Sequence, residues 1–279
     1  MYLSLNSTTT AGRVSWPDFA KLAARIGYPA VDVAITSAFD AGAQATNALL
    51  KDLKIRPGIL GFPVDFRKDE ETYRKDMARL DAYARFASAI GCPRMTTYIL
   101  PSAPTPKDET RKLLLSRFRP AAEILDRSGV RLGIEFISPV HLRKMFPYEF
   151  IWRMDEMLEF ALQCGHNVGL LVDSWHWHHA DGKVSDIMAA GKQNIVHVQI
   201  NDSADLPPDK IKDNERLMPG EGVIDLQAFL QALSRIGYRD AVSPEIFGRG
   251  LKEMTPEDGA KLGLQTSQAI MDKYLQTAA

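Results

Sequence analysis

The 279-residue chain lacks several features that would each point to a particular class of protein. Its 34 lysines and arginines are balanced by 35 aspartates and glutamates, so it has no basic surplus with which to neutralise a row of phosphates. It has no uninterrupted apolar run near the roughly twenty residues that a membrane helix needs. Its first residues lack the basic and apolar regions of a signal peptide. We therefore expect no nucleic-acid partner, no membrane partner and a cytoplasmic location.

Cysteine is also scarce. The chain has only Cys92 and Cys164, each next to a glycine, and a single possible pair gives no disulfide framework. We expect both to be buried, unreactive thiols.

What the chain does have is a recurring order of helix, glycine and strand. A helix-like stretch, a glycine and a short apolar run follow one another in segments 24–35, 88–100, 126–137, 162–173 and 234–247. Glycine readily adopts the left-handed conformation that ends a helix. Each segment therefore predicts a helix that stops and a strand that starts.

The whole chain is predicted to alternate between strands and helices. Segments 2–7, 56–62 and 194–202 bring the strand candidates to eight, and helices are expected at about 17–26, 42–53, 69–90, 108–127, 149–164, 184–191, 225–235 and 257–275. Such alternation indicates a parallel sheet, and eight units in this length are typical of a closed (β/α)8 TIM barrel. No linker divides residues 1–279, so we expect one domain. A doubly wound open sheet is the alternative, although no Gly-rich phosphate turn follows the first strand.

Polar residues end the last four predicted strands, where a TIM barrel has its active site. They are Glu135 in GIEF, Asp173 in VDSWH, a residue within VHVQIND, and Glu245 in PEIF. Carboxylates at the ends of apolar strands are costly unless a cation holds them. Their convergence on one barrel mouth predicts a metal site.

These segments, together with ERLMPGEGVID at 215–225, resemble the xylose-isomerase-like TIM-barrel superfamily, also called the sugar phosphate isomerase/epimerase group. The resemblance follows the strand and helix order over most of the chain, with specific motifs within 131–247. It implies one divalent ion held by Glu135, Asp173, Gln199 and Glu245. The family spacing before Asp202 favours Gln199, while His197, which strand alternation places on the same face, is the alternative ligand.

The implied ligand set suggests the ion. Three carboxylates and one amide oxygen form an all-oxygen shell, which suits Mn²⁺ or Mg²⁺, with Co²⁺ also accepted. The histidine-rich trinuclear zinc site of the related endonucleases is not expected, because three of the six histidines lie in one short stretch and the chain has no basic surplus.

The resemblance implies proton-transfer chemistry on a sugar. The ion would polarise a carbonyl and its neighbouring hydroxyl and stabilise an enediolate, with Glu135 and Glu245 as acid and base. We expect a sugar isomerase or epimerase acting on a ketose or keto-sugar. The alternative is a lyase or dehydratase, similar to 3-dehydroshikimate or inosose dehydratase, acting on a 3-keto-sugar, a keto-glycoside or a cyclic polyol ketone; Gln199 in place of the commoner histidine favours it. A second alternative is a non-catalytic sugar-binding subunit.

The stretch LLVDSWHWHHADG, residues 170–182, is read as a strand end and a loop. D-x-x-H is the spacing of the family that the chain resembles, and the resemblance implies that His176 contacts the substrate or acts as an acid or base. Trp175 and Trp177 could stack on a sugar ring or simply pack. We expect His178 and His179 to be solvated loop residues.

Residues 201–226 are polar and Pro-rich, which predicts a long loop that acts as a lid or clamp. Within it, Arg216 falls where the family has a substrate-binding arginine. His141 and Arg143 are weaker candidates for substrate contacts. No phosphate cradle is evident, so we expect an unphosphorylated sugar, and the resemblance allows a homo-oligomer.

Overall fold

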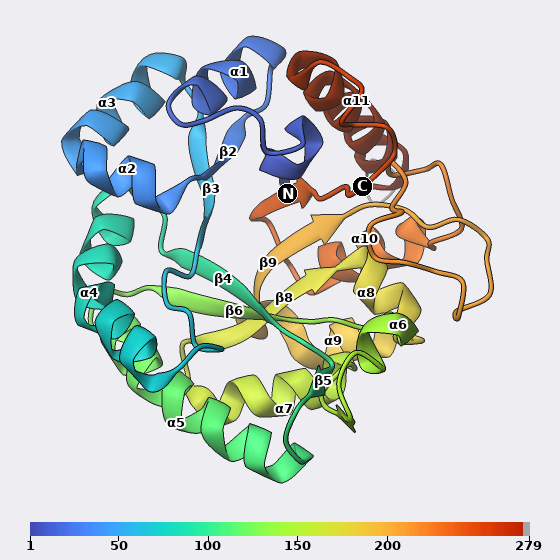
Figure 1. The fold of residues 1–279 in the computed structure, drawn as a ribbon. Coiled ribbons are helices and arrows are strands. Elements are labelled where there is room, and N and C mark those ends of the chain that lie inside the picture. Colours follow the sequence, from blue (N-terminus) through green and yellow to red (C-terminus); the bar gives the residue numbers. More distant parts are fainter. Residues whose placement is uncertain (276–279) are drawn as a thin grey trace.

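The computed structural model describes residues 1–275 and shows eight parallel strands closed into a barrel inside a ring of helices (Figure 1). Around the barrel the order is β1, β10, β9, β8, β6, β4, β3 and β2, which returns to β1. The predicted TIM barrel is confirmed, and closure of the sheet excludes the doubly wound alternative.

The barrel strands are β1 (Tyr2–Leu5), β2 (Ala30–Val33), β3 (Arg56–Gly61), β4 (Arg94–Ile99), β6 (Arg131–Phe136), β8 (Val168–Asp173), β9 (Ile195–Ile200) and β10 (Ala241–Pro244). The predicted helices appear as α1 (Asp18–Ile26), α3 (Ala43–Leu53), α4 (Glu70–Ala89), α5 (Lys107–Asp126), α7 (Met154–Cys164), α9 (Val184–Asn194), α10 (Leu226–Arg235) and α11 (Pro256–Leu275). The sequence did not predict the short elements η1 (Ser7–Thr10), α2 (Ile35–Ala41), β5 (Ser102–Ala103), α6 (Val140–Arg143), β7 (Tyr148–Glu149) and α8 (Ser174–His179).

Most of the glycines that were predicted to end helices have a positive φ, which favours glycine. Gly27 ends α1 with φ 103° and donates its N–H to the carbonyls of Ala23 and Ala24. Gly165 ends α7 with φ 168°, which is extended backbone that any residue can adopt. Its nearest contact explains the choice better, because a Cβ there would lie 3.0 Å from the side chain of Ala122.

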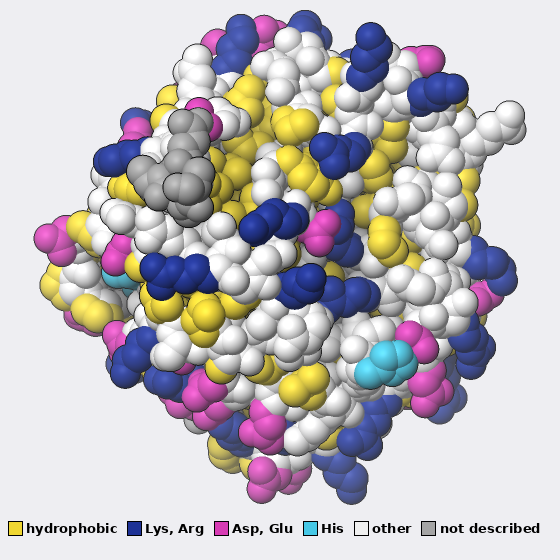
Figure 2. Space-filling view, turned by 180° about the vertical axis from the view of Figure 1, so that it is seen from behind, with side chains coloured by type: hydrophobic (Ala, Val, Ile, Leu, Met, Phe, Trp, Pro, Cys, Tyr) yellow, Lys and Arg dark blue, Asp and Glu magenta, His cyan; other side chains and the backbone are white. Residues whose placement is uncertain are grey.

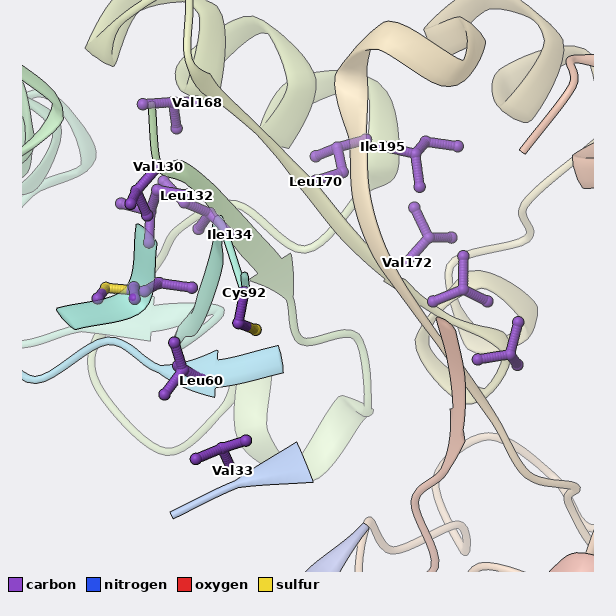
Figure 3. Packing of buried hydrophobic residues seen from close by; sticks show 14 of the residues in the cluster. Val33, Leu60, Cys92, Val130, Leu132, Ile134, Val168, Leu170, Val172 and Ile195 are labelled. Atoms are coloured by element: carbon purple, nitrogen blue, oxygen red, sulfur yellow. The ribbon is translucent and has the colours of Figure 1, made fainter. Parts of the chain in front are cut away.

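Alternation along the strands divides an outer apolar layer from the barrel interior. Leu132 and Ile134 of β6, with Leu170 and Val172 of β8, belong to the buried layer drawn in Figure 3. Each such side chain contributes about 1.5–3 kcal/mol when fully buried. The intervening positions of these strands therefore point into the barrel, and this brings Glu135 and Asp173 to its mouth.

Both cysteines are free and buried, as predicted. Burial raises the pKa of the Cys92 and Cys164 thiols to about 12. On the face seen in Figure 2, cationic and anionic side chains are interspersed with small apolar areas. Among residues 1–275, no helix combines the length and the apolarity that crossing a membrane requires.

The middle of the barrel holds a polar network instead of the branched aliphatic side chains that usually fill it. Asp32 Oδ1 accepts hydrogen bonds from Ser4 Oγ (2.6 Å) and Ser243 Oγ (3.1 Å). His197 Nε2 lies 3.1 Å from the same Ser243 hydroxyl. Gly58 leaves room for this network, because a Cβ there would lie 2.2 Å from Ser4 Oγ.

Asp32 should make stability depend on pH. Burial raises the pKa of Asp32 to about 6, although the hydrogen bonds from Ser4 and Ser243 have the opposite effect and lower it. Since the unfolded value is about 3.9, folding favours the protonated form, and this contribution is present below about pH 4 and lost as pH rises through about 6. Asp32→Asn should lose this dependence. As the pH rises from about 4 to 7.5, the free energy of unfolding of Asp32→Asn should increase by about 1–3 kcal/mol relative to that of the wild type. The measurement is urea denaturation at both pH values. A constant difference across this range would contradict the assignment.

Candidate active site

The carboxylates predicted from the sequence meet at the carboxyl ends of four neighbouring strands. Strands β6, β8, β9 and β10 adjoin one another in the barrel, so the residues that end them face the same part of the mouth. One carboxylate oxygen from each of Glu135, Asp173 and Glu245 lies within 4.8 Å of the others. Gln199 joins them by donating from Nε2 to Glu245 Oε1 at 2.9 Å.

A cavity of about 300 Å³ opens beside this cluster. Its volume is at the lower end of the range for small-molecule sites. The polar lining comes from Glu135, His176, Asp213, Arg216 and Glu245, and the remainder from Tyr98, Leu100, Ile137, Leu142 and Phe247. The cavity therefore combines carboxylates, one imidazole and one guanidinium with an apolar rim.

Arg216 is fully buried at the centre of the cluster. Its Nη1 donates to Asp173 Oδ2 at 3.0 Å and to Glu245 Oε2 at 2.9 Å. Its Nη2 donates to Asp213 Oδ1 at 2.8 Å. The rings of Trp175 and Phe247 lie 5.6 Å and 4.8 Å from its guanidinium carbon. One cation thus holds three carboxylates together.

Asp173 is fixed by its own local structure. It caps the amino end of α8, where its Oδ1 accepts the Trp175 backbone N–H at 2.6 Å. The side-chain amide of Asn201 donates to both oxygens of Asp173 at 3.0 Å. The expected loop after Asp173 is therefore a short helix, because the aspartate satisfies its first free N–H.

Two buried oxygen atoms of the cluster have no hydrogen-bond partner. They are Glu135 Oε1 and Gln199 Oε1. Buried acceptors without a donor are costly and uncommon, so these atoms indicate a missing donor or cation. Carboxylate and amide oxygens are ligands of hard divalent cations, and the residues present fit such an ion.

His197 does not join the carboxylate cluster. Glu135, Asp173 and Glu245 bring their carboxylates together, while His197 Nε2 contacts the Ser243 hydroxyl in the layer below. The contacts therefore favour Gln199 over His197 as the fourth residue of the proposed metal site.

Burial controls the proton affinities at the mouth. It raises the pKa of Glu135 well above its ordinary value, and the charges of Glu245 and Asp173 raise it further. Burial also raises the pKa of Glu245 to about 7, while Arg216 opposes this shift. The pKa of Asp213 is lowered, since Arg216 and His176 outweigh the effect of burial.

His176 is a neutral imidazole in this environment, because burial lowers its pKa to about 4. The backbone N–H of Ser138 donates to its Nδ1 at 3.3 Å, and its Nε2 lies 3.2 Å from Nη2 of Arg216, which is also a donor. Nε2 lies 3.6 Å from Glu135 Oε1 and 3.7 Å from Asp213 Oδ1. The sequence-predicted histidine therefore faces the carboxylates inside the cavity.

Several predicted substrate contacts lie outside this cavity. Trp175 is completely buried behind Arg216, so it cannot act as the exposed sugar platform that its sequence position suggested. Trp177 is buried against Phe229. His141 is exposed, and its Nδ1 lies 3.2 Å from the carbonyl of Ile211, which ties α6 to the lid.

Arg143, which was also a candidate for a substrate contact, and the histidines that follow Trp177 lie outside this cavity as well. Arg143 lies over the ring of Trp152 at 3.9 Å. The prediction that His178 and His179 are solvated loop residues is wrong, because both are half-buried in α8, where His179 Nε2 lies 3.1 Å from Ser203 Oγ. Neither histidine belongs to the carboxylate cluster of the described chain.

The predicted loop is confirmed between β9 and α10. An isolated bridge joins Asp202 to Leu217, and the Asp202 carboxylate accepts the N–H groups of Gly220 and Ile224 at 2.9 Å each. Asp202 therefore fixes the base of the lid. The lid carries Asp213 and Arg216 into the cavity.

Sequence reasoning missed Asn201, Asp213, Tyr98 and Phe247. Asn201 lies two positions after Gln199, so strand alternation could have placed it on the same inward face. Strand alternation could likewise have placed Tyr98, near the end of β4, on the inward face. Nothing in the sequence alone indicated that Asp213 would pair with Arg216, because that contact depends on the folding of the lid.

The chain was compared with known proteins. Residues 20–270 match the protein family described as xylose isomerase-like TIM barrel. Inosose isomerase of Bacillus velezensis is 27% identical over 228 residues, which cover 81% of this chain and 79% of that protein. 3-Dehydroshikimate dehydratase of Pseudomonas aeruginosa is 29% identical over 163 residues, which cover 58% of this chain but only 25% of that protein.

Solved structures share the fold. A xylose isomerase domain protein from Alicyclobacillus acidocaldarius is 29% identical, with a TM-score of 0.89 and coverage of 97% of this chain and 98% of that one. A structure described as the IOLI protein with a bound zinc atom is 22% identical, with a TM-score of 0.83 and coverage of 98% and 99%. At that identity the second similarity concerns the fold alone.

Proposed function

The chain belongs to the xylose isomerase-like TIM-barrel family, and we propose that it is a divalent-metal-dependent isomerase or epimerase of a keto-sugar or a cyclic polyol ketone. The observation that carries the proposal is the carboxylate cluster of Glu135, Asp173 and Glu245 at a cavity of small-molecule size. The relative named inosose isomerase supports a ketone of this class as substrate.

In this proposal the two glutamates transfer protons on either side of the substrate. Glu135 ends β6 and Glu245 follows β10, and β8 and β9 separate these strands in the barrel. A base on one wall can remove the proton from the carbon next to a carbonyl, and an acid on the other can return a proton to the opposite face. Return to the same carbon gives an epimer, and return to the neighbouring carbon gives an isomer.

A divalent cation bound by Glu135, Asp173, Gln199 and Glu245 would supply Lewis acidity toward the substrate's carbonyl and hydroxyl oxygens. We propose Mn²⁺ or Mg²⁺, because all four donors are oxygen atoms. His176 lines the cavity, where its imidazole can contact a substrate oxygen. Tyr98 and Phe247 give the cavity apolar walls that exclude water from the reacting carbon.

The test uses the protein incubated with Mn²⁺ or Mg²⁺ in D₂O and a panel of ketoses, inososes and 3-keto-glycosides. We expect at least one ketone to be converted to an isomer that carries deuterium on the carbon next to its carbonyl. The protein without metal serves as the control. If no member of the panel exchanges a proton although metal binds, the sugar-binding subunit replaces the enzyme as the better proposal.

A lyase or dehydratase is the second candidate. The similarity to 3-dehydroshikimate dehydratase favours it, although the aligned part is a quarter of that protein. Both reactions begin with loss of the proton next to the carbonyl. In the lyase a β-oxygen substituent then leaves as water or an alcohol, so the same incubation would yield an unsaturated ketone.

A further inference from the structure

We propose that the guanidinium of Arg216 competes with a divalent ion for Asp173 and Glu245, and that the ion must displace it from these carboxylates in order to bind. The inference rests on the proposed metal site. It adds that the protein's own lid competes with the metal for the same oxygen atoms.

The contacts of Arg216 define the competition. Its Nη1 lies between Asp173 Oδ2 and Glu245 Oε2, at 3.0 Å and 2.9 Å. These two residues supply two of the three carboxylates that come within 4.8 Å of one another. A single nitrogen atom therefore contacts one oxygen of each of two proposed metal ligands.

Two other donors to Asp173 are held in place by their surroundings. Asp173 Oδ1 is held by the backbone N–H of Trp175 at 2.6 Å, which belongs to the first turn of α8. Asn201 Nδ2 contacts both Asp173 oxygens and also the carbonyl of Glu245 at 3.1 Å. The first donor is a helix backbone group, and the second belongs to a side chain whose Oδ1 also accepts the Ser174 hydroxyl at 2.9 Å. Arg216 has a long side chain, and it lies in the irregular lid.

The guanidinium of Arg216 also has other contacts that it could keep after leaving Asp173 and Glu245. Its Nη2 is bonded to Asp213 Oδ1 at 2.8 Å, and Asp213 is another lid residue. Its guanidinium lies over the exposed ring of Phe247. A small rotation of the side chain can release Nη1 while Nη2 keeps its partner. Nη1 would then face the cavity, where a substrate oxygen can accept it.

Charge adds to the competition. Glu135, Asp173, Asp213 and Glu245 place four carboxylates around one guanidinium, so the buried site has more anionic than cationic groups. Arg216 reduces the repulsion among them in the absence of an ion. A divalent ion does the same with twice the charge, and it repels the guanidinium at short range.

The test is a calorimetric titration of Mn²⁺ into the wild type and into Arg216→Met, without substrate. Methionine retains length and apolar packing, but its thioether is a poor ligand for Mn²⁺. We expect the variant to bind Mn²⁺ at least about tenfold more tightly, the size of a typical coupling between two sites. Arg249→Met is the matched control, because Arg249 pairs with Glu221 on the exposed lid and should leave affinity unchanged.

Equal or weaker binding by Arg216→Met would overturn the inference, and so would failure of both proteins to bind any of Mn²⁺, Mg²⁺ and Zn²⁺. If that variant does not fold, the wild type is examined by ¹⁵N NMR of its arginine side chains, with Arg216→Lys to assign the resonance. We expect Mg²⁺ or Zn²⁺ to shift the Arg216 guanidinium signals. Unchanged signals at saturation would overturn the inference. If both proteins bind metal but Arg216→Met binds it no more tightly, this inference fails and the isomerase proposal stands. If neither protein binds metal, both proposals fail. Absence of turnover leaves the titration result standing, because no substrate is used.

Discussion

Replacing Glu245 with glutamine is expected to lower kcat by about three to four orders of magnitude, because it removes a group proposed to transfer protons. The amide has nearly the same shape. The nitrogens of Gln199 and Arg216 lie 2.9 Å from the two carboxylate oxygens. The amide oxygen of the variant can accept from Arg216, and its NH2 group can donate to Gln199 once the Gln199 amide turns its oxygen toward it. The loss should therefore appear in catalysis much more than in folding. The measurement is initial rate, with deuterium incorporation, on the ketone that the D₂O panel identifies.

Glu221→Gln is the matched control for this substitution. Glu221 lies on the same side of the barrel, but it pairs with Arg249 on the lid surface instead of facing the cavity. We expect its activity to remain within about twofold of the wild type, as for most surface changes. Metal titration of Glu245→Gln separates loss of a ligand from loss of a base. Full turnover by this variant would refute both the isomerase and the lyase.

The barrel was predictable because its signals are local. A glycine that adopts a left-handed φ, such as Gly27, ends a helix whatever the rest of the chain does. The cluster of strand-ending carboxylates could also be predicted from the sequence, since a closed barrel brings the ends of β6, β8 and β10 to one mouth. For this reason, Glu135, Asp173 and Glu245 could be grouped across more than a hundred residues of sequence.

The rest of the site depends on contacts that no local pattern encodes. Trp175 was a candidate sugar platform, yet the helical turn that Asp173 caps rotates its ring behind Arg216. Asp213 enters the cavity only because Asp202 pins the lid to the end of β9. The sequence also predicted Arg216 as a substrate contact without indicating that it bridges Asp173 and Glu245. These are tertiary effects of a loop whose own composition predicts no conformation.

The second large effect concerns Gln199, which we expect to be the fourth metal ligand. Gln199→Leu should weaken Mn²⁺ binding by at least about 100-fold, because changes to residues that only support a ligand already cost 10- to 100-fold. The unpartnered Gln199 Oε1 supplies the physical reason, since a buried amide oxygen without a donor is available to an ion. The measurement is calorimetric titration, with thermal unfolding to confirm that the variant is folded.

His197→Gln is the comparison that decides between the two candidates on β9. A glutamine amide nitrogen can replace His197 Nε2 in its 3.1 Å contact with Ser243 Oγ, so the polar network should persist. We expect its Mn²⁺ affinity to stay within about threefold of the wild type, because the side chain lies outside the carboxylate cluster. The reverse result, with affinity lost in His197→Gln and kept in Gln199→Leu, would mean that the ion lies one layer deeper in the barrel. Glu245 would then be free of the metal, and its raised pKa would belong to a base that acts alone.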